Sequence, residues 1–562
     1  MKRLLIGILL AAPIYTRAQT QQTTAPVDIP ILLSGGFGEL RNNHFHSGID
    51  IKTQGVINKP IYSIEDGYIS RIFVSPSGYG LALYVMHPST GQMSVYGHLN
   101  KFAPEIASYV KDMQYEQETY RIDLYPEKDR LPVKKGKLIA YSGNTGSSGG
   151  PHLHFEIRDE SSERVFDPLA HYKDRIKDNV SPELRGIAIY PADGEGIVNG
   201  SRNALRQNIT RAKSGNYQNL KTPVQAWGKI GFAVKAYDRM TGTVNSYGVK
   251  IIRLFVDNKK IYQSDVRNFS FSESRMINSF VDFEDWRSNR SFFMKSFVDP
   301  GNTLPFYDAD KKGYIAIDQQ KTYNFRYELE DAFGNIERYT FSVEGRKQAI
   351  PQVTGLSQYM VWNQDNHYLS DNFSLIIPKG NLYADFPFTL KQSSSDVYFS
   401  DKYQINNRPV PFHDKAEIKI KLKSDPLKDK KQYGIVMLKA GKEQWVGGYY
   451  SNQTLIASIR EAGGEYAVSY DDKAPVITPV QSNLWEKQQK IIFKAADNKS
   501  GISSWRGTID GQFALFEHDV KSPTYTYKFD SSRLTRNKTH KLEFTVTDAC
   551  GNASTYSSEF YY

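Results

Sequence analysis

A pair of short turn motifs occurs twice in the chain and constrains the fold of its last two thirds. The first motif is KAYDRMTG (235–242), which matches KAADNKSG (494–501). The second is DAFGN (331–335), which matches DACGN (548–552). The pattern Asp-x-x-Gly-Asn is typical of a turn between strands, because its glycine can take a positive φ. The repeat therefore predicts two divergent copies of one β-sandwich.

The spacing of the two motifs sets the expected domain organisation. They lie 93 residues apart in the first copy and 51 in the second, so the first copy carries a long insertion. The copies resemble immunoglobulin-like modules of bacterial surface proteins, and we expect them at 180–347 and 473–562. Short β-type runs also fill 350–470, which predicts a β-rich middle domain. The whole chain is thus expected to be mainly β.

The first 18 residues show the three parts of a secretory signal peptide. Lys2 and Arg3 precede an apolar run at 4–12, and small residues suited to cleavage follow it. The run is too short to span a bilayer, which takes about 20 apolar residues. We predict a signal peptide at 1–18, a polar linker at 19–30, and export to the periplasm or cell envelope, with full secretion left open.

Charge and cysteine content exclude several classes of function. The formal net charge is +10, falling to +7 without the three cationic residues of the predicted signal peptide, and it is spread along the chain. A nucleic-acid-binding protein usually concentrates such charge in a patch. The single cysteine, Cys550, allows neither an intrachain disulfide nor a cysteine metal site. Any bound metal must therefore be held by His, Asp or Glu.

Residues 31–175 combine hairpin patterns with one helical segment. The stretches PIYSIEDGYISRIF and GLALYVMHPSTGQMSVYGHL alternate apolar and polar residues and are broken by turn dipeptides, which predicts hairpins. A short amphipathic helix that caps the sheet is expected at 102–113. Its residues at helical spacing, with Pro104 near the start, are Phe102, Ile106, Tyr109, Val110 and Met113.

Two histidine-rich segments in the same region indicate a metal centre. HFHSGID holds His46 and Asp50, HLHFEI holds His152 and His154, and His98 ends the predicted strand SVYGHL. Even spacing along an extended chain places both side chains on one face. Catalytic zinc takes about three protein ligands and one open position. His46, Asp50 and one histidine of the second pair supply that set. The other histidine of the pair would lie roughly 6.5 Å from the first along the strand, facing the reacting atoms.

The remaining histidines have a structural interpretation. We expect surface or packing roles for His87, His367, His413, His518 and His540. His44 is expected either at the surface or supporting the ligands from behind.

Six segments of this region occur in the order found in one known family. They are FGELRNNHFHSGIDI, YSIEDGYI, GYGLALYVMH, VYGHL, VKKGKLIAYSGNTG and GGPHLHFEI. They resemble the lysostaphin/LytM-type zinc metallopeptidases over roughly 35–160, and we expect that domain at 31–175. The resemblance implies a duplicated-hybrid-motif β-fold with its cleft across an antiparallel sheet, and a cleft wall at 143–150. It implies one zinc ion and hydrolysis of the peptide stems and cross-bridges of peptidoglycan by water that zinc activates. It also implies His46, Asp50 and His154 as zinc ligands, with His98 and His152 as the catalytic pair.

The chain departs from that family pattern in two places. The segment between His98 and Val133 is longer than usual and holds the predicted helix, which we expect to narrow the cleft. The β modules lie outside the resemblance, and we expect them to be spacers or docking units without catalysis. Two other functions stay open. The protein could be a non-catalytic regulator of other wall hydrolases, although such a regulator would not need all five site residues. It could also be a surface adhesin or scaffold, with the β modules carrying that function. For an active enzyme, we expect direct D-alanyl to diamino-acid cross-links to be preferred over pentaglycine bridges.

Overall fold

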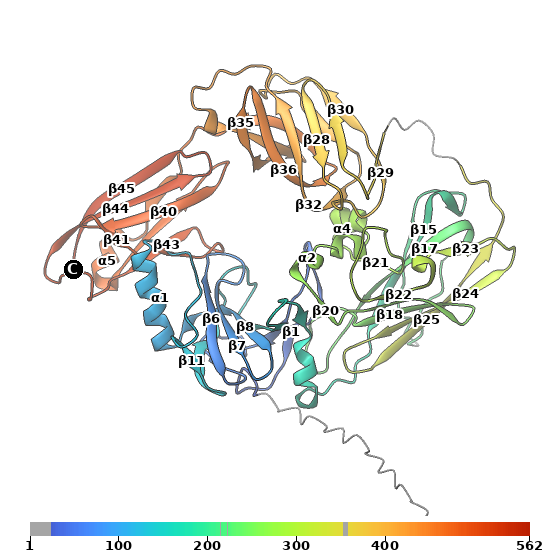
Figure 1. Cartoon of the computed structure of the whole chain (residues 1–562), viewed down its shortest axis with the longest axis horizontal. Coiled ribbons are helices and arrows are strands. Elements are labelled where there is room, and N and C mark those ends of the chain that lie inside the picture. Colours follow the sequence, from blue (N-terminus) through green and yellow to red (C-terminus); the bar gives the residue numbers. More distant parts are fainter. Residues whose placement is uncertain (1–23, 214, 222, 352–357) are drawn as a thin grey trace, which may run out of the picture.

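The structure is a computed structural model that describes residues 24–213, 215–221, 223–351 and 358–562. Strands dominate and the helices are few, which confirms the expected mainly β protein. Four β-rich bodies follow one another around a closed loop, so that the last body returns to the first (Figure 1). The predicted signal peptide, 1–18, and the start of the predicted linker lie outside the described residues.

The N-terminal domain (residues 24–175) is built on one large antiparallel sheet. Its strand order is β1-β4-β13-β8-β7-β6-β10, and a small sheet, β5-β12-β9, packs against it. The shared core contains Ile51 and Leu153 of the large sheet and Ile61 and Ile139 of the small one, all fully buried. The elements are β1 (Leu33–Gly35), β2 (Leu40–Arg41), β3 (His44–Phe45), β4 (Ile49–Lys52), β5 (Pro60–Tyr62), β6 (Gly67–Val74), β7 (Leu81–His87), β8 (Gln92–Leu99), β9 (Lys101–Phe102), α1 (Pro104–Glu116), β10 (Ile122–Leu124), β11 (Pro132–Val133), β12 (Leu138–Tyr141), β13 (His152–Asp159), β14 (Val165–Phe166), η1 (Pro168–His171) and η2 (Lys173–Arg175).

Residues 24–30 belong to this domain, which corrects the linker expected at 19–30. Ala25 and Val27 are buried in the domain core. The amide of Thr24 donates to the carbonyl of Ile64, and the amide of Tyr62 donates to the carbonyl of Pro26. The polar composition of the segment hid these contacts, because two small apolar residues are enough to anchor a short stretch.

The helix expected at 102–113 is α1, Pro104–Glu116. Pro104 occupies the first turn, where its missing N–H removes no helical hydrogen bond. Ile106 and Val110 are buried against the domain. The helix therefore begins two residues later than expected and extends three residues further, with the predicted face inward.

The first module (residues 180–347) has two facing layers. They belong to one hydrogen-bonded sheet in the order β16-β15-β17-β25-β24-β18-β19-β22, with β21 and β23 beside β17, and β17 joins β25 over two residue pairs only. The ring of Phe232 on β17 lies 4.5 Å from that of Phe325 on β24, so the layers pack face to face. The elements are β15 (Glu183–Val198), β16 (Leu205–Asn208), β17 (Gln225–Tyr237), β18 (Ile251–Val256), β19 (Lys259–Asp265), β20 (Asn268–Phe269), α2 (Phe271–Ser274), α3 (Ile277–Phe280), α4 (Phe283–Asn289), β21 (Met294–Lys295), β22 (Tyr307–Ala309), η3 (Asp310–Gly313), β23 (Ile315–Ile317), β24 (Thr322–Glu330) and β25 (Ile336–Gly345).

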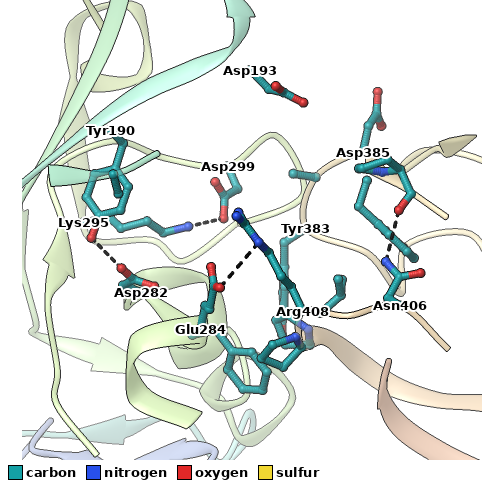
Figure 2. A pocket seen from close by; sticks show the side chains of 18 of the residues that line it. Tyr190, Asp193, Asp282, Glu284, Lys295, Asp299, Tyr383, Asp385, Asn406 and Arg408 are labelled. Atoms are coloured by element: carbon teal, nitrogen blue, oxygen red, sulfur yellow. Dashed lines mark hydrogen bonds and ion pairs between the residues drawn. The ribbon is translucent and has the colours of Figure 1, made fainter. Parts of the chain in front are cut away.

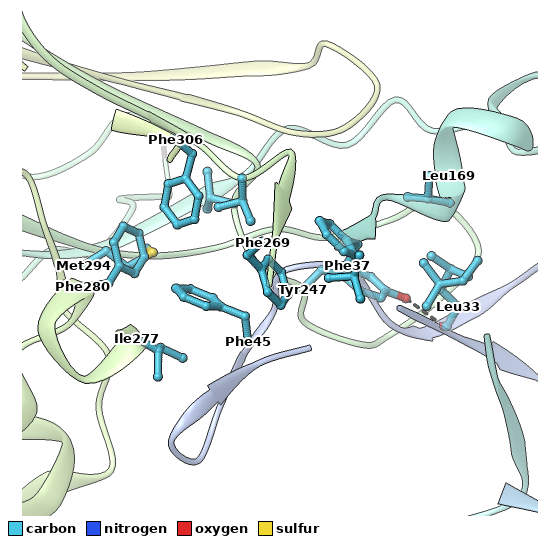
Figure 3. Packing of buried hydrophobic residues seen from close by; sticks show 14 of the residues in the cluster. Leu33, Phe37, Phe45, Leu169, Tyr247, Phe269, Ile277, Phe280, Met294 and Phe306 are labelled. Carbon is cyan, nitrogen blue, oxygen red and sulfur yellow. Dashed lines mark hydrogen bonds between the residues drawn. The ribbon is translucent and has the colours of Figure 1, made fainter. Parts of the chain in front are cut away.

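The N-terminal domain and the first module share one hydrophobic core. Phe45 is buried among Phe269, Phe280 and Phe306, with ring centroids 5.5–5.8 Å apart (Figure 3). These three rings come from the segment between the two turn motifs of the first copy, where the spacing is longer. Strand β14 also pairs with β20 across the boundary. The long segment of the first copy thus packs directly behind the β2–β3 hairpin.

The middle unit (residues 358–471) is a separate two-layered β body. Its sheets are β27-β28-β32-β36-β35 and β30-β31-β37-β33-β34, and the rings of Phe373 and Tyr403 stack at 4.9 Å between them. The elements are β26 (Tyr359–Met360), β27 (Asn366–Leu369), β28 (Phe373–Ile377), β29 (Phe386–Pro387), β30 (Leu390–Ser393), β31 (Lys402–Ile405), β32 (Val410–Lys421), η4 (Lys430–Gln432), β33 (Tyr433–Lys439), β34 (Lys442–Gly447), β35 (Tyr449–Ser451), β36 (Thr454–Ala462) and β37 (Glu465–Tyr470).

A cavity of about 940 Å³ lies between the first module and the middle unit. Figure 2 shows its charged groups, several of which are paired with one another. Lys295 Nζ lies 2.5 Å from Asp299 Oδ2, and Arg408 Nε lies 3.6 Å from Glu284 Oε1. The Arg408–Glu284 pair joins the two bodies, so these charges serve the contact between them.

The C-terminal module (residues 473–562) consists of sheets β38-β39-β43-β42 and β41-β40-β44-β45. The rings of Phe493 and Phe544 stack between them at 4.7 Å. The elements are β38 (Val476–Pro479), η5 (Ser482–Leu484), α5 (Trp485–Gln488), β39 (Lys490–Ala496), β40 (Ile502–Ile509), β41 (Gln512–Ala514), β42 (Glu517–His518), β43 (Thr524–Lys528), β44 (Thr539–Asp548) and β45 (Ala553–Tyr561).

The C-terminal module closes the loop of bodies by packing on α1. The ring of Tyr115 lies 5.6 Å from that of Phe513, and Lys111 Nζ lies 2.5 Å from Asp530 Oδ2. Just beyond the helix, Glu118 forms an ion pair of 2.6 Å with Arg506. The helical insert, expected to narrow the cleft, thus serves as a docking surface for a body almost 400 residues further along the chain.

Candidate metal centre

The pairing of two strands brings the expected ligands together. In the register of β4 and β13, Asp50 lies directly opposite His154, and His152 lies opposite Lys52. On the other side of β13, His154 lies opposite Gly97 of β8. His46 comes from the turn between β3 and β4. Segments about a hundred residues apart thus meet on one face of the large sheet, because β4, β13 and β8 are neighbouring strands.

Three ligand atoms converge on one point. Asp50 Oδ1 lies 3.1 Å from His46 Nε2 and 3.0 Å from His154 Nδ1, and the two nitrogens are 3.0 Å apart. All three residues are buried. Tetrahedral zinc with bonds of about 2.0–2.1 Å separates its ligand atoms by roughly 3.3 Å. A single ion therefore fits between these atoms with small adjustments.

The outer nitrogens of both imidazoles already have partners. His46 Nδ1 lies 2.7 Å from the carbonyl oxygen of Gly36, and His154 Nε2 lies 2.8 Å from Glu156 Oε1. Since a carbonyl or carboxylate oxygen only accepts, these nitrogens carry the hydrogens. The lone pairs of His46 Nε2 and His154 Nδ1 then face each other and Asp50. With both rings neutral, these lone pairs repel the carboxylate and each other, and either a proton on one ring or a metal ion between them relieves the repulsion.

Glu156 anchors His154 and was missed in the sequence analysis. It is fully buried and accepts hydrogen bonds from Ser47 Oγ, Tyr79 Oη and Arg158 Nε as well as from His154. The signal in the sequence is its position in HLHFEI, where it shares the strand face of His152 and His154. Arg41 plays a similar part for Asp50, with its Nη2 3.1 Å from Oδ2.

His98 points into the centre from an irregular backbone. Gly97 and His98 together oppose the single residue Ala82 of β7, which defines a β-bulge, and His98 has a φ of 57°. A β-bulge changes the direction in which a side chain points. Left-handed backbone at a non-glycine residue is strained, and it persists only where the surrounding structure imposes it. The His98 ring lies 4.8 Å from that of His152 and 5.8 Å from that of His154.

The two remaining histidines of the site are oriented by backbone carbonyls. His98 Nδ1 lies 2.8 Å from the carbonyl oxygen of Thr145, and His152 Nδ1 lies 2.8 Å from that of Gly150. In each neutral ring the hydrogen therefore sits on Nδ1, and Nε2 is the acceptor. Both carbonyls belong to the loop 143–150, so this loop sets the orientation of the pair.

Electrostatics keep His98 neutral and the carboxylates of Asp50 and Glu156 ionised. Burial lowers the pKa of His98 to about 3, and the nearby His154 and His152 add to the shift. Burial disfavours charge on His154 too, but hydrogen bonds to Asp50 and Glu156 outweigh it and raise its pKa to about 9. Burial opposes ionisation of Asp50 and Glu156, yet His46 and Arg158 respectively help to hold their pKa values below the usual range.

The loop 143–150, expected to form a wall of the cleft, contacts the loop 75–80 through hydrogen bonds. The amide of Ser147 donates to the carbonyl of Gly78, and the amide of Leu81 donates to Thr145 Oγ1. Gly146 has a φ of 70°, and a Cβ there would lie only 2.4 Å from the carbonyl oxygen of Gly78 and from the amide nitrogen of Gly80. Only glycine fits at position 146, so the packing of the two loops requires Gly146.

The C-terminal module contacts this same loop. The amide of Gly146 donates to Asp519 Oδ2 at 2.9 Å, and Lys521 Nζ lies 2.6 Å from the carbonyl oxygen of Gly146. The amide of Val520 donates to the carbonyl of Pro76, in the facing loop. One loop of the last body thus contacts both loops that position His98.

The other histidines lie outside the centre. His87 is buried, with its ring nitrogens near Ser94 Oγ and the carbonyl oxygen of Asp66, so it is a packing residue. His44 is exposed, and its Nδ1 lies 2.8 Å from the carbonyl oxygen of Asn42. His540 is buried in the C-terminal module between Asp510 and the carbonyl oxygen of Thr535.

Comparison with known families matches two parts of the chain. The family described as Peptidase family M23 matches residues 126–168, the part of the N-terminal domain that carries His152 and His154. The family described as Zu5-like domain matches residues 357–471, which coincides with the middle unit.

Individual relatives each match about a quarter of the chain. An uncharacterized metalloprotease of Haemophilus influenzae is 35% identical over 125 residues, which is 22% of this chain and 20% of the relative. The match therefore spans about a fifth of that relative. A zinc-containing peptidase from Vibrio cholerae is 29% identical, with 25% of this chain and 37% of that chain covered and a TM-score of 0.19. The catalytic domain of lysostaphin from Staphylococcus simulans is 24% identical, with 25% and 92% covered and a TM-score of 0.19.

None of the helices in the described part of the chain has both the length and the apolar composition needed to cross a membrane.

Proposed function

We propose that the protein is an exported zinc-dependent endopeptidase acting on peptidoglycan peptides, because residues 126–168 match the model of peptidase family M23. His46, Asp50 and His154 would hold the ion. The observation that carries this proposal is the convergence of Asp50 Oδ1, His46 Nε2 and His154 Nδ1 within 3.1 Å of one another. Zinc bound there would polarise the scissile carbonyl and lower the pKa of a bound water to about 7.

His98 and His152 are proposed to move the proton. With Nδ1–H of each ring bound to a carbonyl of the loop 143–150, Nε2 of each is left to accept a proton from the attacking water. The imidazolium that forms then stabilises the negative charge on the tetrahedral oxygen and donates its proton to the leaving amine. A neutral His98 in the resting site is the state that such a base requires.

The loop 143–150 also supports an extended peptide as the substrate. Nothing lies within 4 Å of where a Cβ would stand on Gly149 or Gly150, so the backbone of a substrate can approach the loop closely here. We propose the direct D-alanyl to diamino-acid cross-link as the bond cleaved. The basis is the predicted export together with the absence of any sequence feature typical of targeting to glycine-bridged walls.

A non-catalytic role is the alternative. It would need neither the strained backbone at His98 nor the oriented pair of imidazoles, and both are present. An adhesin or scaffold function of the β modules could accompany catalysis, but it would leave the five site residues without a purpose.

Digestion of purified peptidoglycan tests the proposal. The zinc-loaded protein is expected to release fragments whose masses correspond to cut peptide cross-links, and metal removal should abolish the release until zinc is restored. A direct cross-linked muropeptide dimer should be cut faster than a pentaglycine peptide. The opposite order would overturn the choice of bond alone, whereas no cleavage of any peptide by the zinc-loaded protein would favour the regulator.

A further inference from the structure

Two clusters of three carboxylates lie away from the metal centre, one in each module that carries the repeated turn motifs. The first consists of Asp178, Asp238 and Asp331, and the second of Asp471, Asp497 and Asp548. In each cluster, one oxygen from every residue lies within 4.8 Å of the others.

The clusters occupy equivalent places in the two modules. The first aspartate of each lies in the segment that enters the module, before β15 or β38. The second follows the end of β17 or β39, and the third lies at the end of β24 or β44. The arrangement therefore belongs to the repeated fold, and the turn motifs supply two of its three aspartates in each copy.

Hydrogen bonds around the clusters are repeated as well. Asn335 Nδ2 donates to the carbonyl of Asp178 and to Asp331 Oδ2. In the second copy, Asn552 Nδ2 donates to the carbonyl of Asp471 and to Asp548 Oδ2. The asparagine of the Asp-x-x-Gly-Asn motif thus ties the third aspartate to the entering segment in both modules, and it brings their carboxylates close together.

Five of the six aspartates are buried, Asp497 is half-buried, and three of their oxygens lack a hydrogen-bond partner. Asp178 is 8% exposed, Asp238 5% and Asp331 2%, and Asp178 Oδ2 and Asp238 Oδ1 have no hydrogen-bond partner. Asp497 Oδ1 is likewise buried and unpartnered in the second copy. Among the described residues, no lysine or arginine forms a salt bridge with any of the six. Burial and the facing Asp331 and Asp178 raise the pKa of Asp238 to about 8.

We propose that each cluster binds one Ca²⁺ ion. Three carboxylates without nitrogen or sulfur ligands suit a hard cation, and a cation removes the repulsion between them. Ca²⁺ accepts six to eight oxygen ligands in irregular geometry, whereas Mg²⁺ demands a near-ideal octahedron and usually keeps several waters. The carboxylates here are held by backbone and asparagine donors, and this irregular arrangement matches Ca²⁺. The unpartnered oxygens of Asp178, Asp238 and Asp497 are free to be ligands.

The position of the ions gives them a mechanical role. Asp178 lies between η2 of the N-terminal domain and β15, and Asp471 directly follows β37 of the middle unit. A cation would therefore fix each entering segment to the module that follows it. Two of the joints in the closed loop of bodies would then be stiffened, including the one that carries the C-terminal module to the loop 143–150.

Calcium titration of the full-length, zinc-saturated protein tests this proposal. Calorimetry at millimolar Ca²⁺, the range of many extracellular sites, should give two ions per chain. Asp238→Asn and Asp497→Asn should each reduce the number to one, and the double variant to none. Asp472→Asn, an exposed neighbour of the second cluster, is the matched control and should still bind two.

Thermal unfolding separates cation binding from a structural role of the aspartates. Ca²⁺ should raise the unfolding midpoint of the wild type and raise that of the double variant little. Without Ca²⁺, the double variant should be at least as stable as the wild type, because the asparagines remove buried like charges. Unchanged stoichiometry in the variants, equal binding of Mg²⁺, or equal destabilisation with and without Ca²⁺ would each overturn the proposal.

Discussion

At the scale of single residues, the site depends on side chains that would not touch the metal. Glu156 holds the N–H of His154 and is itself held by Ser47, Tyr79 and Arg158. This network selects the ring nitrogen of His154 that faces Asp50. The two-residue period of HLHFEI places Glu156 on the correct face, but its partners come from three other segments.

We predict that Glu156→Gln weakens zinc binding by about 10- to 100-fold, as is usual for partners of metal ligands. The neutral amide accepts less strongly from His154 and leaves Arg158 without its buried counter-charge. Zinc affinity is measured by competition with a chromogenic chelator. Glu163→Gln is the matched control, because Glu163 is exposed and pairs with the same arginine at 3.1 Å. Equal affinities for the two variants would contradict this role.

His98→Ala is predicted to keep zinc and lose about 10²- to 10⁴-fold in kcat, the usual contribution of a positioned acid or base. The side chain lies beside the ligand cluster and accepts protons through Nε2, but it supplies none of the three converging atoms. Metal analysis and peptide cleavage rates on the same sample test this. His44→Ala, exposed and two residues from His46, should cleave at the wild-type rate. A wild-type rate for His98→Ala would make that residue purely structural.

At the scale of elements, the β2–β3 hairpin connects the metal centre to the first module. Phe45 at its end is 1% exposed and lies among Phe269, Phe280 and Phe306, and His46 follows directly. The segment that makes the first copy longer than the second is therefore part of the support for a metal ligand. A chain cut near residue 180 would expose this aromatic surface, so its folding cannot be assumed.

Phe45→Ala is expected to destabilise the protein by about 3–5 kcal/mol, the usual cost of truncating a buried phenylalanine. Zinc affinity should fall with it, because the hairpin that positions His46 loses its anchor. Thermal unfolding and zinc competition measure the two effects. Tyr449→Ala, at a residue 62% exposed, is the control and should change neither. Unchanged zinc affinity in Phe45→Ala would show that the hairpin keeps its position without its aromatic contacts.

At the scale of the whole molecule, the closed loop of bodies places the C-terminal module against the loop 143–150. Asp519 and Lys521 contact Gly146, whose neighbour Thr145 orients His98. The modules were expected to be spacers or docking units without catalysis. The contacts fit docking, and they place the docked loop one residue from the Thr145 carbonyl that orients His98.

Asp519→Ala is therefore predicted to lower kcat by roughly 10- to 100-fold while zinc content stays unchanged, since small misplacements of a catalytic group have such effects. A chain ending at residue 347 should show the same loss if it folds and binds zinc. Asp530→Ala removes an ion pair with α1 at the same interface, away from the loop, and should leave kcat unchanged. Equal rates for Asp519→Ala and the wild type would make the contact purely architectural.

The sequence by itself determined the features that depend on local spacing. The period of two in HLHFEI marks one face of β13, because side chains alternate along extended backbone, whereas His46 lies in the turn before the strand that carries Asp50. The apolar period from Phe102 to Met113 marks a helix for a similar reason, and α1 has the predicted inward face. The repeated motifs mark turns, because only certain residues allow the backbone to reverse.

Only the tertiary structure decided what depends on segments distant in the chain. The register of β4 with β13 decides that His154, rather than His152, lies opposite Asp50. The bulge at His98, the partners of Glu156 and the packing of Phe45 arise from contacts between separate strands and bodies. The docking of residues 519–521 on Gly146 joins positions more than 370 residues apart. Local preference cannot encode such contacts, because their free energy exists only once the intervening chain has folded and brought both partners together.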